Sequence, residues 1–411
     1  MPDVTWSVMS IDGVDWNEYS FRDKETFLQE SATLLAACGR TYLSNTMYPH
    51  GNPEPAIMEV YGEVNRRIIE LEPFVKDCRP VKDTAVLHSA DSVWSKAPFL
   101  PSPTWDASPA YYSVTGAHTT LTEGHVQMNI LNSEVFVETI DKYGAVILPD
   151  QRILSKRECE SIRRFVRNGG ALIATGETGT RDTDNNLLKN FSIADVLGVE
   201  LIETRKAANC YLRVKSKNMP HGIPSMDVFT GNSYVHVKAN TAKTLLELVP
   251  AYEGKIAPAE APTGPGVTIN SYGKGKAVYC APHLFHKFME DNTPVLRKLA
   301  LWMLDQVYPE KLRTIVFENT PINVEVFYNQ RGSERFIHLV NYVGNKREKG
   351  TPQVQDLPSV HGIRIHVRLD TKPVRILSVP DGKNIEFTFR SGSVTFEAEP
   401  LKIHSVYKIE I

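Results

Sequence analysis

The chain has 411 residues, 42% of them hydrophobic and 23% charged, with a formal net charge of −2. This balance is ordinary for globular proteins and gives no electrostatic basis for binding nucleic acid or an anionic membrane, which both favour a basic excess. Residues 1–13 lack the pattern of a secretory leader, and no apolar run reaches the roughly 18 residues that span a bilayer, so we expect a cytoplasmic protein.

The cysteine content argues against disulfides and structural zinc. There are five cysteines, an odd number, and no Cys-x-x-Cys spacing occurs. We expect buried free thiols in a reducing compartment. The length predicts two or three domains, which the patterns below divide at residues 1–80, 81–312 and 313–411.

Residues 1–80 read as strand, loop, helix, strand, loop, helix. A strand over 5–11 precedes a helix that starts near Asp23 and that Gly39 should end in a left-handed conformation. A second strand over 40–43 leads through a Pro/Gly/Asn loop to a long helix. Apolar and small side chains at helical spacing should face inward, namely Phe27, Leu28, Ser31, Leu34, Leu35 and Cys38, then Ile57, Val60, Tyr61, Val64, Ile68 and Leu71. Because two β/α units cannot close a parallel barrel of eight, we interpret the segment as a barrel remnant that must pack against other parts of the protein.

Residues 81–312 predict a complete α/β domain. Apolar strands are expected over 84–89, near 125–130, and over 143–149, 171–175 and 273–281. Ser155 and Glu158 have capping-box spacing before a helix with Cys159, Ile162, Phe165 and Val166 inward, and Pro294 opens another helix. Apolar strands alternating with amphipathic helices favour a parallel sheet covered on both faces.

Residues 313–411 change to alternating polar and apolar positions. The runs over 322–328, 335–342 and 363–369, separated by turn residues, predict short antiparallel strands. This pattern is typical of a β-sandwich.

Several blocks resemble a known family. YGAVILPDQRILSKRECESIRRFVRNGGALIATGETGTRD (143–182), GKGKAVYCAPHLFHKF (273–288) and NTPVLRKLALWML (292–304) resemble the β-galactosidase trimerisation domain of family 42 glycoside hydrolases. That domain is a flavodoxin-like relative of the class I glutamine amidotransferase fold. RFIHLVNYVGN (335–345) resembles the small C-terminal β domain of these enzymes. Residues 15–68 resemble the end of the catalytic barrel there and in α-L-fucosidase-like enzymes.

The resemblance implies carbohydrate metabolism and a homo-oligomer (dimer or trimer) formed through the α/β domain. We expect no cofactor. Glycoside hydrolysis needs two carboxylates roughly 5–9.5 Å apart, which the family carries on earlier barrel strands that we cannot match here. We therefore expect the C-terminal portion of a glycoside hydrolase for galactoside-, fucoside- or arabinoside-like substrates, incomplete for catalysis alone. The alternatives are a non-catalytic oligomerisation and sugar-binding module, or a product without activity.

The loops after the first two strands hold the candidate sugar-binding residues. Active sites of barrels lie at the carboxyl ends of strands, and an exposed tryptophan can stack on a sugar face. The candidates are Asp12, Asp15, Trp16, Glu18, Tyr48 and His50. The alternative is that these are ordinary polar loop residues and a packing tryptophan.

Amidotransferase chemistry is not expected of the middle domain. It would need a nucleophilic cysteine after the 171–175 strand, where this chain has Gly176 and Glu177. Glu177 faces either a cleft, a neighbouring subunit or solvent. His283 and His286 lack an evident third ligand, so we expect loop or interface histidines and no metal site. His338 alternates with apolar residues and is expected to pack inside a strand.

Overall fold

The computed structural model divides the chain into two compact units. Unit 1 comprises residues 1–81 and 314–411, and unit 2 comprises residues 82–313. The structure describes residues 6–11, 13, 20, 22–95, 111–215, 219, 222–252, 256–344, 346–347, 353–354 and 356–411, without the side chains of 205–208, 346–347 and 353–354. The division into three domains at residues 80 and 312 stays a prediction.

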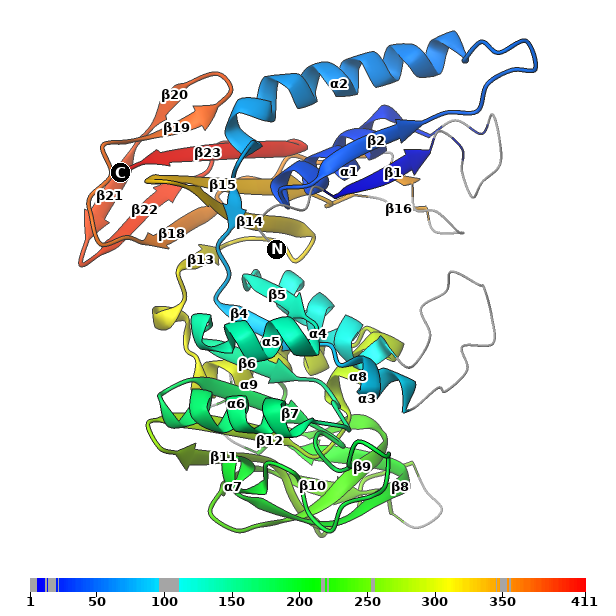
Figure 1. Cartoon of the computed structure of the whole chain (residues 1–411), viewed down its shortest axis with the longest axis vertical. Helices are drawn as coiled ribbons and strands as arrows, with labels where there is room; N and C mark the ends of the chain where they lie inside the picture. Colours follow the sequence, from blue (N-terminus) through cyan, green and yellow to red (C-terminus); the bar gives the residue numbers. More distant parts are fainter. Residues whose placement is uncertain are drawn as a thin grey trace. The chain divides into compact units, whose positions relative to one another are not determined.

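Unit 2 is built on a nine-stranded mixed sheet (Figure 1). Five neighbouring strands run parallel, and the last four continue the sheet as antiparallel strands. In spatial order the strands are β5 (Met128–Leu131), β4 (Thr84–Leu87), β6 (Ala145–Leu148), β7 (Ala171–Thr175), β12 (Gly275–Cys280), β11 (Gly264–Tyr272), β10 (Lys243–Pro250), β8 (Val199–Arg213) and β9 (Asp227–Ala239).

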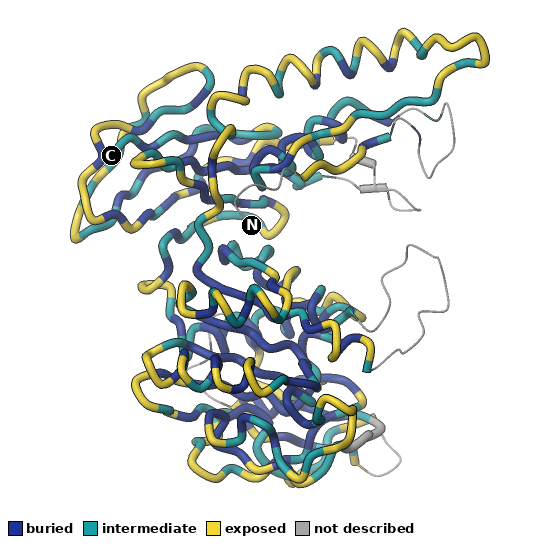
Figure 2. The backbone as a smooth tube through the Cα atoms, viewed as in Figure 1, coloured by how far each residue is buried: buried dark blue, intermediate teal, exposed yellow. Residues whose placement is uncertain are grey.

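Helices cover both faces of the parallel part. One face packs on α4 (Tyr112–Glu123), α8 (Leu284–Asp291) and α9 (Pro294–Val307). The other packs on α5 (Ser133–Thr139), α6 (Lys156–Arg167) and α7 (Ala194–Leu197). The short α3 (Ala90–Trp94) follows β4, and 3₁₀ turns occupy Ile140–Lys142 and Glu310–Leu312. Every residue of β4, β6 and β7 is buried (Figure 2), as expected for strands covered twice. This confirms the predicted mixed α/β character.

The start of α6 follows from its local sequence. Ser155 Oγ accepts a hydrogen bond from the backbone N–H of Glu158, and the Glu158 carboxylate accepts one from the N–H of Ser155 at 2.7 Å. These are the two halves of a capping box. The predicted inward residues Cys159, Ile162, Phe165 and Val166 are buried. The capping box is therefore confirmed.

Unit 1 contains two larger antiparallel sheets that share a core. One has β20 (Lys383–Ile385), β19 (Arg375–Val379), β23 (His404–Glu410), β15 (Glu334–Asn341), β14 (Val324–Arg331) and β3 (Arg79–Pro80). The other has β13 (Ile315–Glu318), β18 (Arg364–Arg368), β22 (Ser393–Glu397) and β21 (Phe387–Arg390). A short pair joins β16 (Lys346–Arg347) to β17 (Gln353–Val354). Side chains from both larger sheets, such as Ile337 and Ile365, form one hydrophobic cluster. The content is sandwich-like.

The N-terminal segment of unit 1 is a β/α/β/α run. Strands β1 (Ser7–Ile11) and β2 (Arg40–Ser44) pair in parallel, and α1 (Lys24–Ala36) and α2 (Pro55–Val75) follow them. Both helices pack on the six-stranded sheet: Leu35 of α1 and Leu71 of α2 share a cluster with Val379 and Val406. Figure 2 shows α2 buried along one side only. Packing against β strands, rather than helical propensity alone, holds these helices.

The end of α1 differs from the prediction. The helix stops at Ala36, and Cys38, not Gly39, takes the left-handed conformation, with φ of 61°. Gly39 is needed for another reason, because a Cβ there would lie 2.5 Å from the Trp6 ring. Leu28, Leu34 and Cys38 are only partly buried. None of the described helices is long and apolar enough to cross a membrane.

Candidate functional site

Buried polar side chains gather at the carboxyl edge of the parallel sheet in unit 2. Ser89, Asp150, Gln151, Thr175 and Thr178 follow or end β4, β6 and β7, and each is almost fully buried. Gln151 Oε1 accepts from the Ser89 N–H at 2.8 Å, and Thr178 Oγ1 donates to the carbonyl of Leu148 at 2.9 Å. Ligand sites of open α/β sheets lie at this edge, which makes it the first place to look for function.

The Asp150 carboxylate is the centre of this cluster. Its side chain is fully buried, yet it accepts hydrogen bonds from Ser113 Oγ at 2.5 Å and from Thr175 Oγ1 at 2.9 Å. His283 Nδ1 lies 3.1 Å from Asp150 Oδ1. Because a carboxylate only accepts, the shared hydrogen belongs to Nδ1, and in the neutral imidazole Nε2 of His283 is then the acceptor nitrogen. The His283 side chain is 18% exposed.

Gly176 makes room for this pair. It follows β7 with φ of 50°, and a Cβ there would lie 2.2 Å from Asp150 Oδ1 and 2.4 Å from His283 Nδ1. Its N–H donates to the carbonyl of Cys280, and its own carbonyl accepts from Tyr279 Oη. Glycine is thus required both for the backbone conformation and for the close approach.

Aromatic and charged side chains lie on the same loops and helix starts. The rings of Tyr112 and His286 are in contact, with centroids 5.4 Å apart and planes tilted at 46°. Arg152 pairs with Glu177 at 3.2 Å, and burial lowers the pKa of this arginine. Arg152 is therefore the ion-pair partner of Glu177. Whether Glu177 faces a cleft or a neighbouring subunit stays a prediction. His286 lies inside α8 rather than in a loop and pairs with Glu290 at 3.3 Å.

The buried thiols are poor nucleophiles. Burial raises the pKa of Cys78 and Cys210 to about 11 and that of Cys280 well above its usual value. The thiolate is the reactive form. All five cysteines are free, and Cys280, at the end of β12, is held protonated beside the cluster.

The predicted sugar-binding residues of unit 1 are only partly described. Asp12, Asp15, Trp16 and Glu18 lie outside the described residues.

Tyr48 and His50 lie together in the loop between β2 and α2, with ring centroids 5.3 Å apart. Tyr48 Oη donates to the Glu54 carboxylate, and His50 Nδ1 accepts from the backbone N–H of Asn52. Sugar binding by all six residues stays a prediction.

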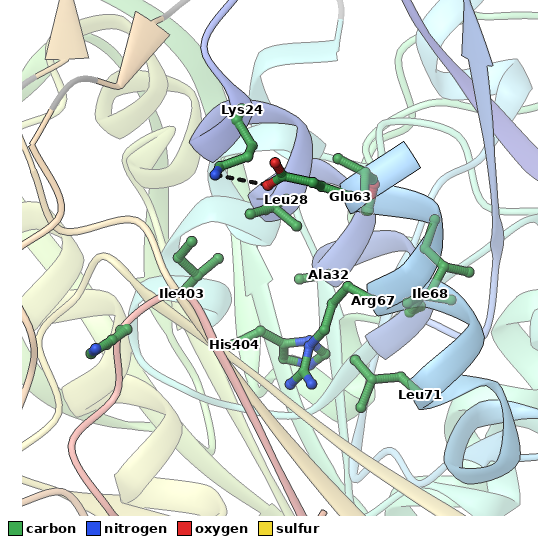
Figure 3. A pocket seen from close by; sticks show the side chains of 13 residues that line it. Lys24, Leu28, Ala32, Glu63, Arg67, Ile68, Leu71, Ile403 and His404 are labelled. Atoms are coloured by element: carbon green, nitrogen blue, oxygen red, sulfur yellow. Dashed lines mark ion pairs between the residues drawn. The ribbon is translucent and has the colours of Figure 1, made fainter. Parts of the chain in front are cut away.

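A pocket of about 330 Å³ lies in unit 1 between α1, α2 and the start of β23 (Figure 3). Leu28, Ala32, Ile68 and Leu71 give it an apolar wall. Its polar side chains are Lys24, Glu63, Arg67, Lys402 and His404, besides Ser31. Glu63 is the one carboxylate among the described lining residues, and it pairs with Lys24 at 2.8 Å. The hydrogen bond from Lys24 lowers the pKa of Glu63.

Sequence reasoning did not single out Ser113 or Asp150. A signal was present, because Asp150 follows a buried strand directly. His338 is buried in β15, as predicted, and its ring stacks on His404. In the part of the chain that the structure describes, no three His, Cys, Asp or Glu side chains are placed to hold a metal ion.

Comparison with known proteins gives a family match for unit 2 and a curated relative for part of the chain. The family model of the β-galactosidase trimerisation domain matches residues 82–301. The chain is 30% identical over 166 residues to β-galactosidase BbgII of Bifidobacterium bifidum, an alignment covering 38% of this chain and 22% of that protein.

Two solved structures share the fold along nearly the whole chain. The α-L-fucosidase isoenzyme 2 of Paenibacillus thiaminolyticus has a TM-score of 0.83 at 18% identity, covering 98% of this chain and 60% of that one. The β-galactosidase of Bacillus circulans sp. alkalophilus has a TM-score of 0.68 at 18% identity, covering 98% and 55%. The chain thus matches only part of the length of each relative.

Proposed function

This chain belongs to the family defined by the β-galactosidase trimerisation domain, and from that premise we propose that it is the C-terminal portion of a glycoside-hydrolase-type protein, which self-associates through unit 2. The observation that carries the proposal is the family match over residues 82–301, which spans most of unit 2. Galactoside-, fucoside- and arabinoside-like sugars are the proposed substrates of the assembled enzyme, and its proposed location is the cytoplasm.

The finer fold is part of the proposal. The parallel part of unit 2 would be the flavodoxin-like, amidotransferase-related domain, and β1–α1–β2–α2 the end of a β/α barrel. Two parallel strands do not make a stable sheet alone. Val8 and Met9 of β1 and Tyr42 of β2 are 49%, 45% and 56% exposed. Neighbouring barrel strands would cover these side chains and pair the free edge.

The chain alone is proposed to lack a complete catalytic centre. A glycosidase needs an acid and a second carboxylate facing each other across the sugar. The described pocket of unit 1 offers Glu63, which is bound to Lys24. A single ion-paired carboxylate cannot be both the acid and the second carboxylate. By itself, the chain is therefore proposed to be a non-catalytic module for assembly and sugar binding.

The self-association surface is proposed on the antiparallel part of unit 2. Phe229 of β9 is 37% exposed, and Tyr252 and Ile256 are 59% and 81% exposed. The buried Tyr211 lies between them, since its hydroxyl donates to the Ile256 carbonyl and its ring lies 5.7 Å from that of Phe229. Contiguous exposed apolar side chains are typical of protein interfaces. A second copy of the chain is the proposed occupant.

Two measurements on the purified chain test the function. Sedimentation equilibrium at micromolar concentration should show a dimer or trimer, and nitrophenyl β-galactoside, α-L-fucoside and α-L-arabinoside should be hydrolysed no faster than in buffer. A monomer would contradict the assembly role. Robust hydrolysis, lost when Asp12 or Asp15 is changed to Asn, would show that the chain holds its own catalytic centre.

A further inference from the structure

The cluster around Asp150 has no role in the assembly proposed above. Ser113, Asp150 and Thr175 are almost fully buried polar residues. Burying a charge is costly unless it is paired and hydrogen-bonded. Here Ser113 and Thr175 donate to the carboxylate and His283 completes the set. An apolar core would hold the sheet together without this cost, so a function that uses His283 is a better explanation than stability.

We propose that Nε2 of His283, oriented by Asp150, accepts a hydrogen bond from a hydroxyl of a neutral sugar bound at the carboxyl edge of the sheet in unit 2. The pair fixes which ring nitrogen carries the hydrogen, as second-layer carboxylates do for functional histidines. Nε2 is then an acceptor on a ring that remains 18% exposed. An acceptor there requires a ligand that donates O–H or N–H.

The neighbouring side chains favour a neutral polyhydroxyl ligand over an anion. The Asp150 carboxylate lies beside His283, and Arg152 on the β6 loop is already paired with Glu177. Arg181 donates to the backbone carbonyl of Asn185. On α8, Lys287 pairs with Glu290 and Asp291. A phosphate or carboxylate would therefore meet an uncompensated negative charge.

Two aromatic rings belong to the same two helices that carry Ser113 and follow His283. Tyr112 precedes Ser113 on α4, and His286 lies one helical turn beyond His283. The centroids of these two rings lie 5.4 Å apart, with the ring planes tilted at 46°. The two helices pack closely because Gly116 faces the backbone of α8, where a Cβ would lie 2.0 Å from the Phe285 carbonyl. An aromatic ring beside a hydrogen-bond acceptor suits a sugar, which offers both C–H faces and hydroxyl donors.

The inference rests on the proposed function only for the choice of sugars as probes. The full chain, labelled with ¹⁵N-histidine, is titrated with D-galactose, L-fucose or L-arabinose, each to about 100 mM, which is about a hundredfold above a millimolar Kd. The His283 signals are assigned from their loss in His283→Asn. We expect an Nδ1–H tautomer and a saturable shift of Nε2 with at least one sugar, absent with glycerol.

Two variants separate the site from general effects. Ser113→Ala removes one donor to Asp150 and should weaken sugar binding roughly fivefold, the size of one hydrogen bond. His361→Gln, at an exposed position in unit 1, should change nothing. An Nε2–H tautomer, or no saturable shift with any of the three sugars, would overturn the inference. If a monomeric, inactive chain binds a sugar in this way, the proposed sugar contact of His283 is supported and the proposed self-association is refuted.

Discussion

His338 and His404 stack inside unit 1, with Nδ1 of the first 3.1 Å from Nε2 of the second. Burial lowers the pKa of His338 to about 3 and that of His404 well below 6.5. Both rings are therefore neutral in the folded chain. Two charged imidazoles at this distance would repel each other, so the folded pair holds both rings neutral at pH values where free histidines are already protonated.

This pair predicts acid sensitivity of unit 1. A group with a lowered histidine pKa contributes stability above its unfolded pKa, near 6.5, and loses it as pH falls. Between pH 7.5 and 5, His338 alone should cost about 2 kcal/mol of unfolding free energy. Urea unfolding at both pH values measures this. His338→Phe should lose about that much of the pH dependence while His361→Gln keeps it, and equal pH dependence in all three chains would contradict the assignment.

The anchoring of α2 on the six-stranded sheet makes a second prediction. Leu71 is fully buried in a cluster with Leu35, Val379 and Val406. Leu71→Ala should lower the unfolding free energy of unit 1 by about 3 kcal/mol, through lost burial and the cavity left behind.

The matched control is Ile69→Ala, two residues earlier on α2 and 66% exposed. It should change stability by no more than about 0.5 kcal/mol. Equal small effects of both substitutions in chemical denaturation would mean that α2 is not held by this sheet.

Gly176 provides a test of how tightly the Asp150–His283 pair is built. Gly176→Ala adds a Cβ 2.2 Å from Asp150 Oδ1 and imposes a left-handed conformation on alanine. Strain of about 1–2 kcal/mol and overpacking of about 1–3 kcal/mol should add up. Thermal and urea unfolding of unit 2 measure the loss.

Gly332→Ala isolates the conformational part. Gly332 has φ of 57°, close to that of Gly176, but a Cβ there meets nothing within 4 Å. Its substitution should cost only the strain, about 1–2 kcal/mol. If Gly176→Ala costs no more than Gly332→Ala, the close approach of the carboxylate is not as described.

Local signals made part of the fold predictable. The capping box at Ser155 and Glu158 depends on residues three apart, and β6 and β7 are short apolar runs flanked by turn residues. The antiparallel extension was not predicted. Strands such as β9 have many partly exposed positions, so they carry no continuous apolar run. Residues such as Cys38 also enter the left-handed region without the glycine that signals it.

The candidate site was less predictable, because its residues come from distant parts of the chain. Ser113, Asp150 and His283 belong to α4, the loop after β6 and the start of α8, and only the sheet order brings them together. A sequence scan sees a serine, an aspartate and a histidine of ordinary spacing. The order of parallel strands is set by crossover packing, which leaves no local signature.

The proposed contact between copies gives the last prediction. Ile256 is 81% exposed, and the hydroxyl of Tyr211 donates to its carbonyl, which ties it to the Phe229 side of the sheet. Ile256→Asp would place a charge in the centre of a packed apolar contact, where an unpaired charge is poorly tolerated. Sedimentation equilibrium should show at least about a tenfold weaker association, equivalent to about 1.4 kcal/mol.

Leu187→Asp in unit 2 and Val374→Asp in unit 1, 53% and 77% exposed, are the matched controls and should associate normally. If Ile256→Asp associates normally and Leu187→Asp associates weakly, the contact between copies lies at the loop after β7, and the proposed surface on the antiparallel part of unit 2 is refuted.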